Sequence, residues 1–136
     1  MGELNVLFYT GSKNEVNEKL YSLADIVSLS ARTRVFRNID DLSRRLSQPV
    51  SDRATVAVLL AGNKEDLLKI VSIRHLLLDI PIILILYDRE EDTTAMGYAL
   101  YPRFLTYAYP RFLTYADSNL AEVAAVLGKM VEKYNK

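Results

Sequence analysis

The hydrophobic residues of this chain follow two alternating patterns. Short, nearly continuous apolar runs are typical of strands, and stretches in which apolar residues recur every three or four positions are typical of helices. Each strand-like run is followed by a helix-like stretch, which predicts an α/β domain with a parallel sheet, right-handed connections and helices on both faces. The predicted strands are Val6–Tyr9, Thr33–Phe36, Ala54–Ala61, Ile82–Tyr87 and Phe112–Tyr115.

Capping residues indicate where the first three helices begin. Ser12–Glu15 is a capping-box pattern, with a hydroxyl at the N-cap and a carboxylate three residues later. Asn38 and Asn63 are N-cap residues for the next two helices, and the second of these is predicted from Lys64 to about Leu78.

The last two helices are predicted from charge and periodicity. The acidic stretch that begins at Asp88 complements a helix N-terminus, and this short helix is expected to end near Leu100. The last helix carries an apolar stripe made of Leu120, Val123, Ala124, Leu127, Val131 and Tyr134.

The strand order follows from how apolar each strand is. Ala54–Ala61 and Ile82–Tyr87 are apolar almost throughout, which suits strands that are covered on both faces at the centre of a sheet. The second and fifth strands are more polar and are expected at the edges. This pattern predicts a doubly wound five-stranded sheet of order 2-1-3-4-5, in a single domain over residues 1–136.

An exact tandem duplication interrupts this ordinary pattern. The sequence YPRFLTYA occupies residues 101–108 and again residues 109–116. Only one copy has room beside the fourth strand. If the second copy pairs there, Asp117–Asn119 caps the last helix; if the first copy pairs, the second becomes extra chain before that helix. Loop-closure entropy changes slowly with length, so it does not decide between these registers.

The spare copy leads to different expectations for the whole protein. An unpaired strand at a sheet edge is a template for a dimer or for strand exchange. The alternative is a monomer in which the spare copy is a disordered or packed loop. The duplication is also compatible with an engineered strand-duplication variant that has no activity of its own.

Composition and charge exclude several classes of function. The chain has 136 residues, with 17 Lys and Arg balancing 17 Asp and Glu, so direct nucleic-acid binding by bulk charge is not expected. Without cysteine and with one histidine, no Cys-ligated or multi-histidine metal site is possible. The longest apolar run is too short to span a membrane and no signal peptide precedes the first strand, which favours a cytoplasmic protein.

The ends of the predicted strands are where ligands bind in this architecture. With its strand and helix spacing and the DIPII sequence at residues 79–83, the chain resembles the receiver domain of bacterial response regulators. A receiver that accepts phosphate carries two acids after the first strand, an acceptor aspartate at the end of the third, Thr or Ser at the end of the fourth and Lys-Pro at the end of the fifth. The matching positions here hold Thr10, Gly11, Ala61, Leu86 and Tyr115.

Every one of these positions departs from the receiver pattern. No carboxylate ends the first or the third strand, so phosphoryl transfer to aspartate and the binding of its divalent cation are expected to be lost. We therefore interpret the chain as a degenerate receiver, or pseudo-receiver, like those at the N-terminus of some sigma-54-dependent transcription activators. The resemblance implies a non-catalytic module of two-component signalling and transcription regulation, with no cofactor and no metal.

A flavodoxin-like domain is the alternative interpretation. Thr10, Ser12 and Asn14 lie where such a domain binds the phosphate of FMN, since hydroxyls and backbone N–H groups at a helix N-terminus can hold an anion. Ordinary capping by Ser12 and Glu15 explains the same residues and is the preferred interpretation.

Three further groups of polar residues have structural explanations. His75 is interpreted as a structural or surface residue rather than a phosphocarrier, and the acidic stretch of residues 88–92 as a complement to a helix dipole rather than a cation site. Basic residues gather around the second strand and helix, as in a partner or nucleic-acid patch, but interleaved aspartates favour a mixed solvated surface. The basic residues are Arg32, Arg34, Arg37, Arg44, Arg45 and Arg53.

Aromatic residues near the duplication are candidates for an interface. The fourth and fifth elements of receivers are where dimerisation and output partners dock, and aromatic side chains are enriched in interface cores. The expected partners are a second copy of the chain or other protein domains. The interface candidates are Tyr98, Tyr101, Phe104, Tyr107 and Tyr109.

Overall fold

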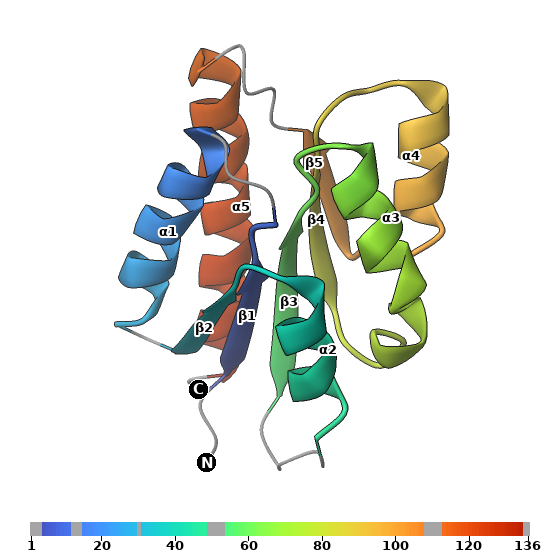
Figure 1. Ribbon diagram of the computed structural model, residues 1–136. Coiled ribbons are helices and arrows are strands. Elements are labelled where there is room, and N and C mark those ends of the chain that lie inside the picture. Colours follow the sequence, from blue (N-terminus) through green and yellow to red (C-terminus); the bar gives the residue numbers. More distant parts are fainter. Residues whose placement is uncertain (1–3, 12–14, 30, 49–53, 108–112, 135–136) are drawn as a thin grey trace.

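A computed structural model describes residues 4–11, 15–29, 31–48, 54–107 and 113–134. The strands form one parallel sheet of order β2-β1-β3-β4-β5, which confirms the predicted topology and the two edge strands (Figure 1). The strands are β1 (Asn5–Tyr9), β2 (Arg32–Phe36), β3 (Thr55–Leu60), β4 (Ile82–Leu86) and β5 (Phe104–Tyr107).

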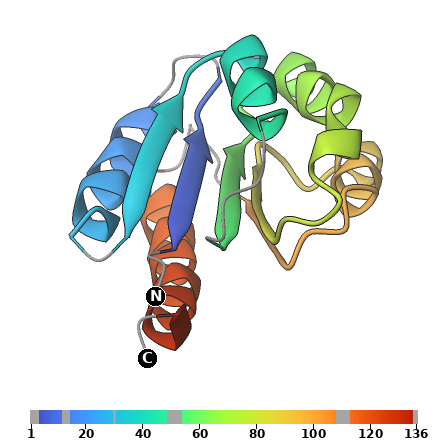
Figure 2. The same cartoon turned by 90° about the horizontal axis from the view of Figure 1, so that it is seen from below.

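Helices cover both faces of this sheet (Figures 1 and 2). One face is covered by α1 (Glu15–Val27) and α5 (Leu113–Tyr134). The opposite face is covered by α2 (Ile39–Leu46), α3 (Lys64–Ser72), the 3₁₀ helix η1 (Arg74–Leu76) and α4 (Glu91–Tyr98).

The apolar runs of the sequence become strands that are buried on both sides. All five residues of β1 and of β4 are buried. Side chains of successive residues point to opposite faces of a sheet, so alternate strand residues belong to different cores. Val6 and Phe8 pack with α1 and α5, whereas Leu7 and Tyr9 pack on the face of α2 and α3.

The predicted N-caps of α2 and α3 are confirmed. The side-chain oxygen of Asn38 accepts a hydrogen bond from the backbone N–H of Asp41 at 2.8 Å. Asn63 does the same for the N–H of Asp66, also at 2.8 Å. However, α3 ends at Ser72 and the chain continues into η1, so the prediction of one helix to Leu78 was wrong.

The two copies of the duplicated sequence have different secondary structures. The first copy supplies β5, which pairs with β4 from Phe104 beside Ile83 to Tyr107 beside Leu86. Leu113 onward, which includes Tyr115, is helical in α5. The predicted strand at Phe112–Tyr115 was therefore wrong, and Asp117–Asn119 lies inside α5 rather than capping it.

The physical reason for this difference is that the sheet has one vacant edge beside β4. The first copy reaches this edge soonest after α4, and its pairing leaves the identical second copy without a strand partner in the described sheet. Because neighbouring structure overrides intrinsic preference, the same Leu-Thr-Tyr sequence is a strand in one copy and a helix in the other. Among the helices of the described ranges, none has both the length and the apolar character required to cross a membrane.

Candidate functional site

The candidate site is the carboxyl edge of the sheet, meaning the end at which all five parallel strands finish, as distinct from the edge strands β2 and β5. Thr10 and Gly11 follow β1, Ala61 follows β3, and Leu86 and Tyr107 end β4 and β5. In doubly wound folds, loops at this edge form the ligand crevice. Tyr115, which was expected at the end of the fifth strand, lies in α5, and Ala108, which follows β5, is outside the described residues.

Thr10 is fully buried at this edge. Its backbone N–H donates a hydrogen bond to the carbonyl of Phe36 at 3.1 Å, which continues the pairing of β1 with β2. The hydroxyl of Thr10 has no hydrogen-bond partner among the described residues. Its burial does not suit a residue that presents a hydroxyl to a flavin phosphate. The other two proposed phosphate contacts, Ser12 and Asn14, lie outside the described residues.

Asp66 brings a carboxylate to the same edge, which was not expected from the strand ends. It is the third residue of α3 and is only 2% exposed. It lies against Gly11, since a β-carbon built on Gly11 would be 2.9 Å from the Asp66 Cγ. The sequence did contain a signal: Asp66 is four residues before Ile70, and residues four apart share one face of a helix. Ile70 is buried in the core under that face.

The pKa of the Tyr9 hydroxyl reflects the burial and the negative charge in the corner where Tyr9 lies near Asp66. Burial and, to a smaller extent, the negative charge of Asp66 together raise the pKa of the Tyr9 hydroxyl to about 12. Removal from water penalises the phenolate, and a nearby carboxylate repels it. The corner formed by Tyr9, Thr10, Gly11 and Asp66 is therefore closed and disfavours additional negative charge.

The positions that carry phosphate chemistry in receivers are apolar at the ends of β3 and β4. Ala61 and Leu86 are both fully buried. Neither side chain can act as a nucleophile, accept a hydrogen bond from a phosphoryl group or coordinate a cation. Within the described ranges, no group of three or more His, Cys, Asp or Glu residues has an arrangement suited to a metal ion.

Tyrosine and threonine side chains connect α4 to the ends of β4 and β5. The Thr93 hydroxyl donates a hydrogen bond to the Tyr87 hydroxyl at 3.3 Å. The hydroxyls of Thr94 and Tyr107 are 3.2 Å apart, and the guanidinium carbon of Arg89 lies 4.7 Å from the centre of the Tyr107 ring. These contacts hold α4 against this end of the sheet.

The predicted interface residues differ in accessibility. Tyr98 at the end of α4 is 58% exposed, and Tyr101 in the following loop is 85% exposed. Tyr101 also has a φ of 53°, a left-handed conformation that is unusual for a residue with a large side chain. Phe104 and Tyr107 in β5 are partly buried, and Tyr109 lies outside the described residues.

An open groove of about 440 Å³ lies beside Tyr101. It separates the segment around η1 from the end of α4, and exposed Leu78 is at its margin. His75 is exposed on η1, consistent with a surface residue. The groove is lined by Arg74, His75, Leu77, Leu78, Ile80, Ala99, Leu100 and Tyr101.

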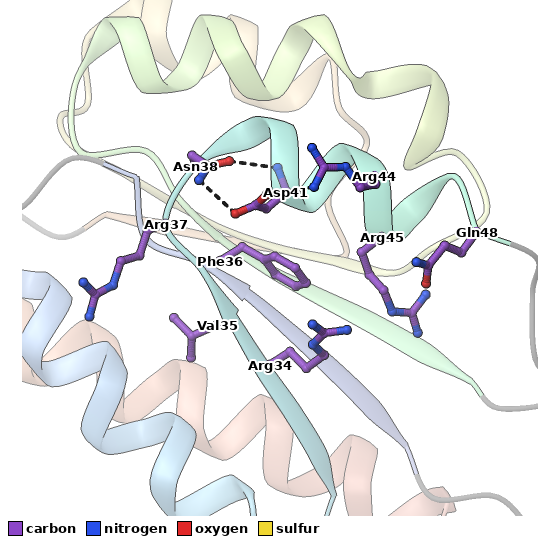
Figure 3. A pocket seen from close by; sticks show the side chains of 9 residues that line it. All are labelled: Arg34, Val35, Phe36, Arg37, Asn38, Asp41, Arg44, Arg45 and Gln48. Carbon is purple, nitrogen blue, oxygen red and sulfur yellow. Dashed lines mark hydrogen bonds and ion pairs between the residues drawn. The ribbon is translucent and has the colours of Figure 1, made fainter.

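A second groove, of about 530 Å³, lies at the opposite edge of the sheet, between β2 and α2 (Figure 3). We call it the arginine groove because four arginines and a single aspartate are among its lining residues, although the guanidinium of Arg37 lies over the ring of Tyr21 in α1. Four of the six arginines in the basic group noted in the sequence are therefore brought together in space. The lining residues are Arg34, Val35, Phe36, Arg37, Asn38, Asp41, Arg44, Arg45 and Gln48.

Comparison with solved structures supports the fold. The chain is similar to the bacteriophytochrome response regulator RtBRR with a TM-score of 0.53 and 17% sequence identity, over 89% of this chain and 77% of that chain. No protein-family model matches the chain, and no curated protein matches its sequence. The similarity establishes a receiver-like fold.

Proposed function

We propose that the chain is a signalling module of the pseudo-receiver type, which acts through protein contacts and does not accept phosphate on an aspartate. The observation that carries this proposal is Ala61, a fully buried residue with an inert side chain at the end of β3, where receivers have their acceptor aspartate. Thr10 and Gly11 stand in place of the two acids that hold the cation in receivers.

Asp66 does not restore the lost chemistry on this interpretation. Its carboxylate is buried against the backbone of Gly11, so a phosphoryl donor would have to displace the chain after β1 to reach it. In-line phosphoryl transfer requires an accessible nucleophile and positive groups that neutralise the phosphoryl oxygens. Leu86 at the end of β4 offers neither a hydroxyl nor a charge.

The test is incubation with acetyl phosphate and Mg²⁺, followed by intact-mass measurement and peptide mapping. We expect no stable phosphoryl adduct on an aspartate, in the native chain or in Asp66→Asn. An adduct on the native chain would overturn the proposal, and its loss in Asp66→Asn would identify the acceptor. A parallel titration with FMN is expected to leave flavin fluorescence unchanged, because saturable quenching would favour the flavodoxin-like alternative.

We further propose that a second copy of the chain is the partner at the edge formed by α4 and β5. β5 pairs with β4 alone in the described sheet, so its outer side is available. Tyr98 and Tyr101 expose apolar surface in the segment that leads into β5, and exposed Leu78 lines the same groove as Tyr101. The chain has no net charge, which removes the long-range repulsion that keeps many proteins monomeric. Strained residues cluster at functional sites, and Tyr101 is such a residue.

Sedimentation equilibrium over a concentration series tests this association. We expect a dimer that is weakened by Tyr98→Ser combined with Tyr101→Gly. The matched control is Leu29→Ser, which removes an exposed apolar side chain from the connection between α1 and β2 and should leave the dimer unchanged. A native chain that stays monomeric at millimolar concentration would refute the self-association.

A further inference from the structure

The outer side of β2 is a second open edge of the sheet. The N–H of Arg32 donates to the carbonyl of Leu4 at 2.9 Å, and the carbonyl of Phe36 accepts from Thr10 at 3.1 Å. Because the hydrogen-bonding groups of alternate residues point to opposite sides of a strand, those of Thr33 and Val35 point away from β1. In the described sheet β2 pairs with β1 alone, so these groups can receive another strand.

The arginine groove lies beside this open edge and carries an uneven charge distribution. In Figure 3 the guanidinium groups of Arg34 and Arg45 and the amide of Gln48 extend to the same side of the Phe36 ring. Asp41 lies away from them, where it accepts a hydrogen bond from the side-chain amide of Asn38 at 2.9 Å. The Arg34 and Arg45 end of the groove is therefore positive.

The carboxylate of Asp41 is already engaged by its neighbours. Besides Asn38 it contacts Arg44, whose guanidinium is 3.5 Å from the other carboxylate oxygen. The guanidinium of Arg45 has no ion pair with any residue that the structure describes. A ligand carboxylate that entered this end of the groove would therefore meet a guanidinium that none of the described acids engages, rather than compete with Asp41.

Arg34 is held in position by the strand itself. It is two residues before Phe36, so both side chains lie on the same face of β2, and the Arg34 guanidinium carbon is 5.3 Å from the centre of the Phe36 ring. Phe36 is buried in the core, so its ring is a fixed support. A cation over an aromatic ring loses less conformational freedom when it binds an anion.

We propose that the β2 edge and the arginine groove bind an extended acidic segment of a partner protein. The segment adds as a strand through the backbone groups of Thr33 and Val35. Its carboxylates, at alternate positions on one face, meet Arg34 and Arg45. Backbone pairing provides affinity in such strand addition, and side-chain pockets provide selectivity. The site lies at the opposite sheet edge from the proposed dimer surface, so it is independent of the self-association.

The same arginines explain why two copies of this chain would not pair through β2. Arg32 and Arg34 are exposed, and two β2 edges brought together would place like charges opposite each other. Positive side chains on an edge strand therefore disfavour self-pairing and select a negatively charged strand. The positive charges of the β2 edge therefore complement an acidic partner and repel a second copy of the same edge.

The test is fluorescence anisotropy with a labelled decapeptide in which glutamate and valine alternate. We expect saturable binding that weakens as salt increases, and a loss of about tenfold or more in Arg34→Glu combined with Arg45→Glu, because charge reversal at both contacts converts attraction into repulsion. The matched control is Arg74→Glu on η1, outside the groove, which should bind as the native chain does. Arg34→Ala with Arg45→Ala gives the same comparison without added negative charge.

Three further probes separate this proposal from its competitors. A peptide with lysine in place of glutamate, and a glutamate peptide N-methylated at alternate residues, should both bind poorly, since the first lacks negative charge and the second cannot pair as a strand. Equal binding of either peptide would overturn the proposal. So would displacement of the acidic peptide by inorganic phosphate or short single-stranded DNA at concentrations near that of the peptide. A change of oligomeric state in the arginine variants would instead assign the groove to a second copy of the chain.

Discussion

The backbone of Gly11 lies directly against the buried carboxylate of Asp66. A β-carbon on Gly11 would be 2.9 Å from both the Cγ and the Oδ2 of Asp66, and the φ of Gly11 is +56°. The connection after β1 therefore takes its course over α3 because position 11 has no side chain. In receivers this is the place of the acidic pair; here one acid approaches the same place from a different element.

Replacing this glycine should destabilise the protein. Gly11→Ala introduces a left-handed backbone strain of roughly 1–2 kcal/mol and also displaces the Asp66 carboxylate, so we expect the free energy of unfolding to fall by about 2–3 kcal/mol. Urea denaturation measures the change. The control is Gly128→Ala in α5, where an added β-carbon meets nothing within 4 Å and helix propensity predicts a gain of about 0.5–1 kcal/mol. Equal changes in the free energy of unfolding for the two variants would contradict the close contact between Gly11 and Asp66.

The raised pKa of Tyr9 makes stability depend on pH in the alkaline range. The ordinary value is 10 and the folded value is about 12, so the unfolded chain loses its Tyr9 proton first. The contribution of Tyr9 is complete below pH 10 and is lost as the pH rises towards 12. Tyr9→Phe removes this dependence, and the native chain should lose about 2–3 kcal/mol relative to the variant across that interval. Parallel unfolding curves at pH 9, 10, 11 and 12 for the two proteins measure it, and a constant difference would refute it.

Removing the buried hydroxyl of Thr10 should increase the stability of the protein. It has no hydrogen-bond partner among the described residues, and burial of an unsatisfied hydroxyl is unfavourable. Thr10→Val keeps the shape of the side chain without the hydroxyl, so we expect a gain of about 1 kcal/mol in thermal or urea unfolding. Thr10→Ser keeps the hydroxyl and removes a methyl group, and should lower stability. A loss of stability in Thr10→Val would show that the hydroxyl has a partner.

The chain has no cysteine, so a single introduced thiol reports which duplicate forms the edge strand. Thr106 in β5 is buried, and Thr114 is the same position of the second copy, in α5. We expect the thiol of Thr106→Cys to be strongly protected from alkylation under native conditions and to react fully after unfolding. If protection were instead found in Thr114→Cys and lost in Thr106→Cys, the second copy would be the strand.

Much of the fold could be predicted because burial on both faces leaves a strong signal in sequence. Ala54–Ala61 and Ile82–Tyr87 are too apolar to be anything but central, and the polar residues of β2 place it at an edge. Asn38 and Asn63 fixed two helix starts, since an amide side chain in that position satisfies a free backbone N–H.

The predictions failed where two segments have the same sequence, and where the nearby sequence does not determine which side chains meet in space. Both copies of YPRFLTYA offer the sheet the same side chains, so composition cannot select between them; chain connection does, by bringing Phe104 to β4 before Phe112. Asp66 was missed because inspection of strand ends does not find a carboxylate that arrives from the first turn of a neighbouring helix. The arginine groove was underestimated because Asp41, near in sequence, turns away from Arg34 and Arg45 in space.

The duplicated segment has a consequence for how this gene can change. A harmful substitution in residues 104–107 leaves an intact copy eight positions further along the chain, and that copy can take over beside β4 if the start of α5 unwinds. We therefore expect this protein to tolerate substitutions in its edge strand that a protein with one copy of the segment would not. A substitution in either copy of the repeat should persist in a population longer than a substitution in β4, because the chain has no second copy of β4.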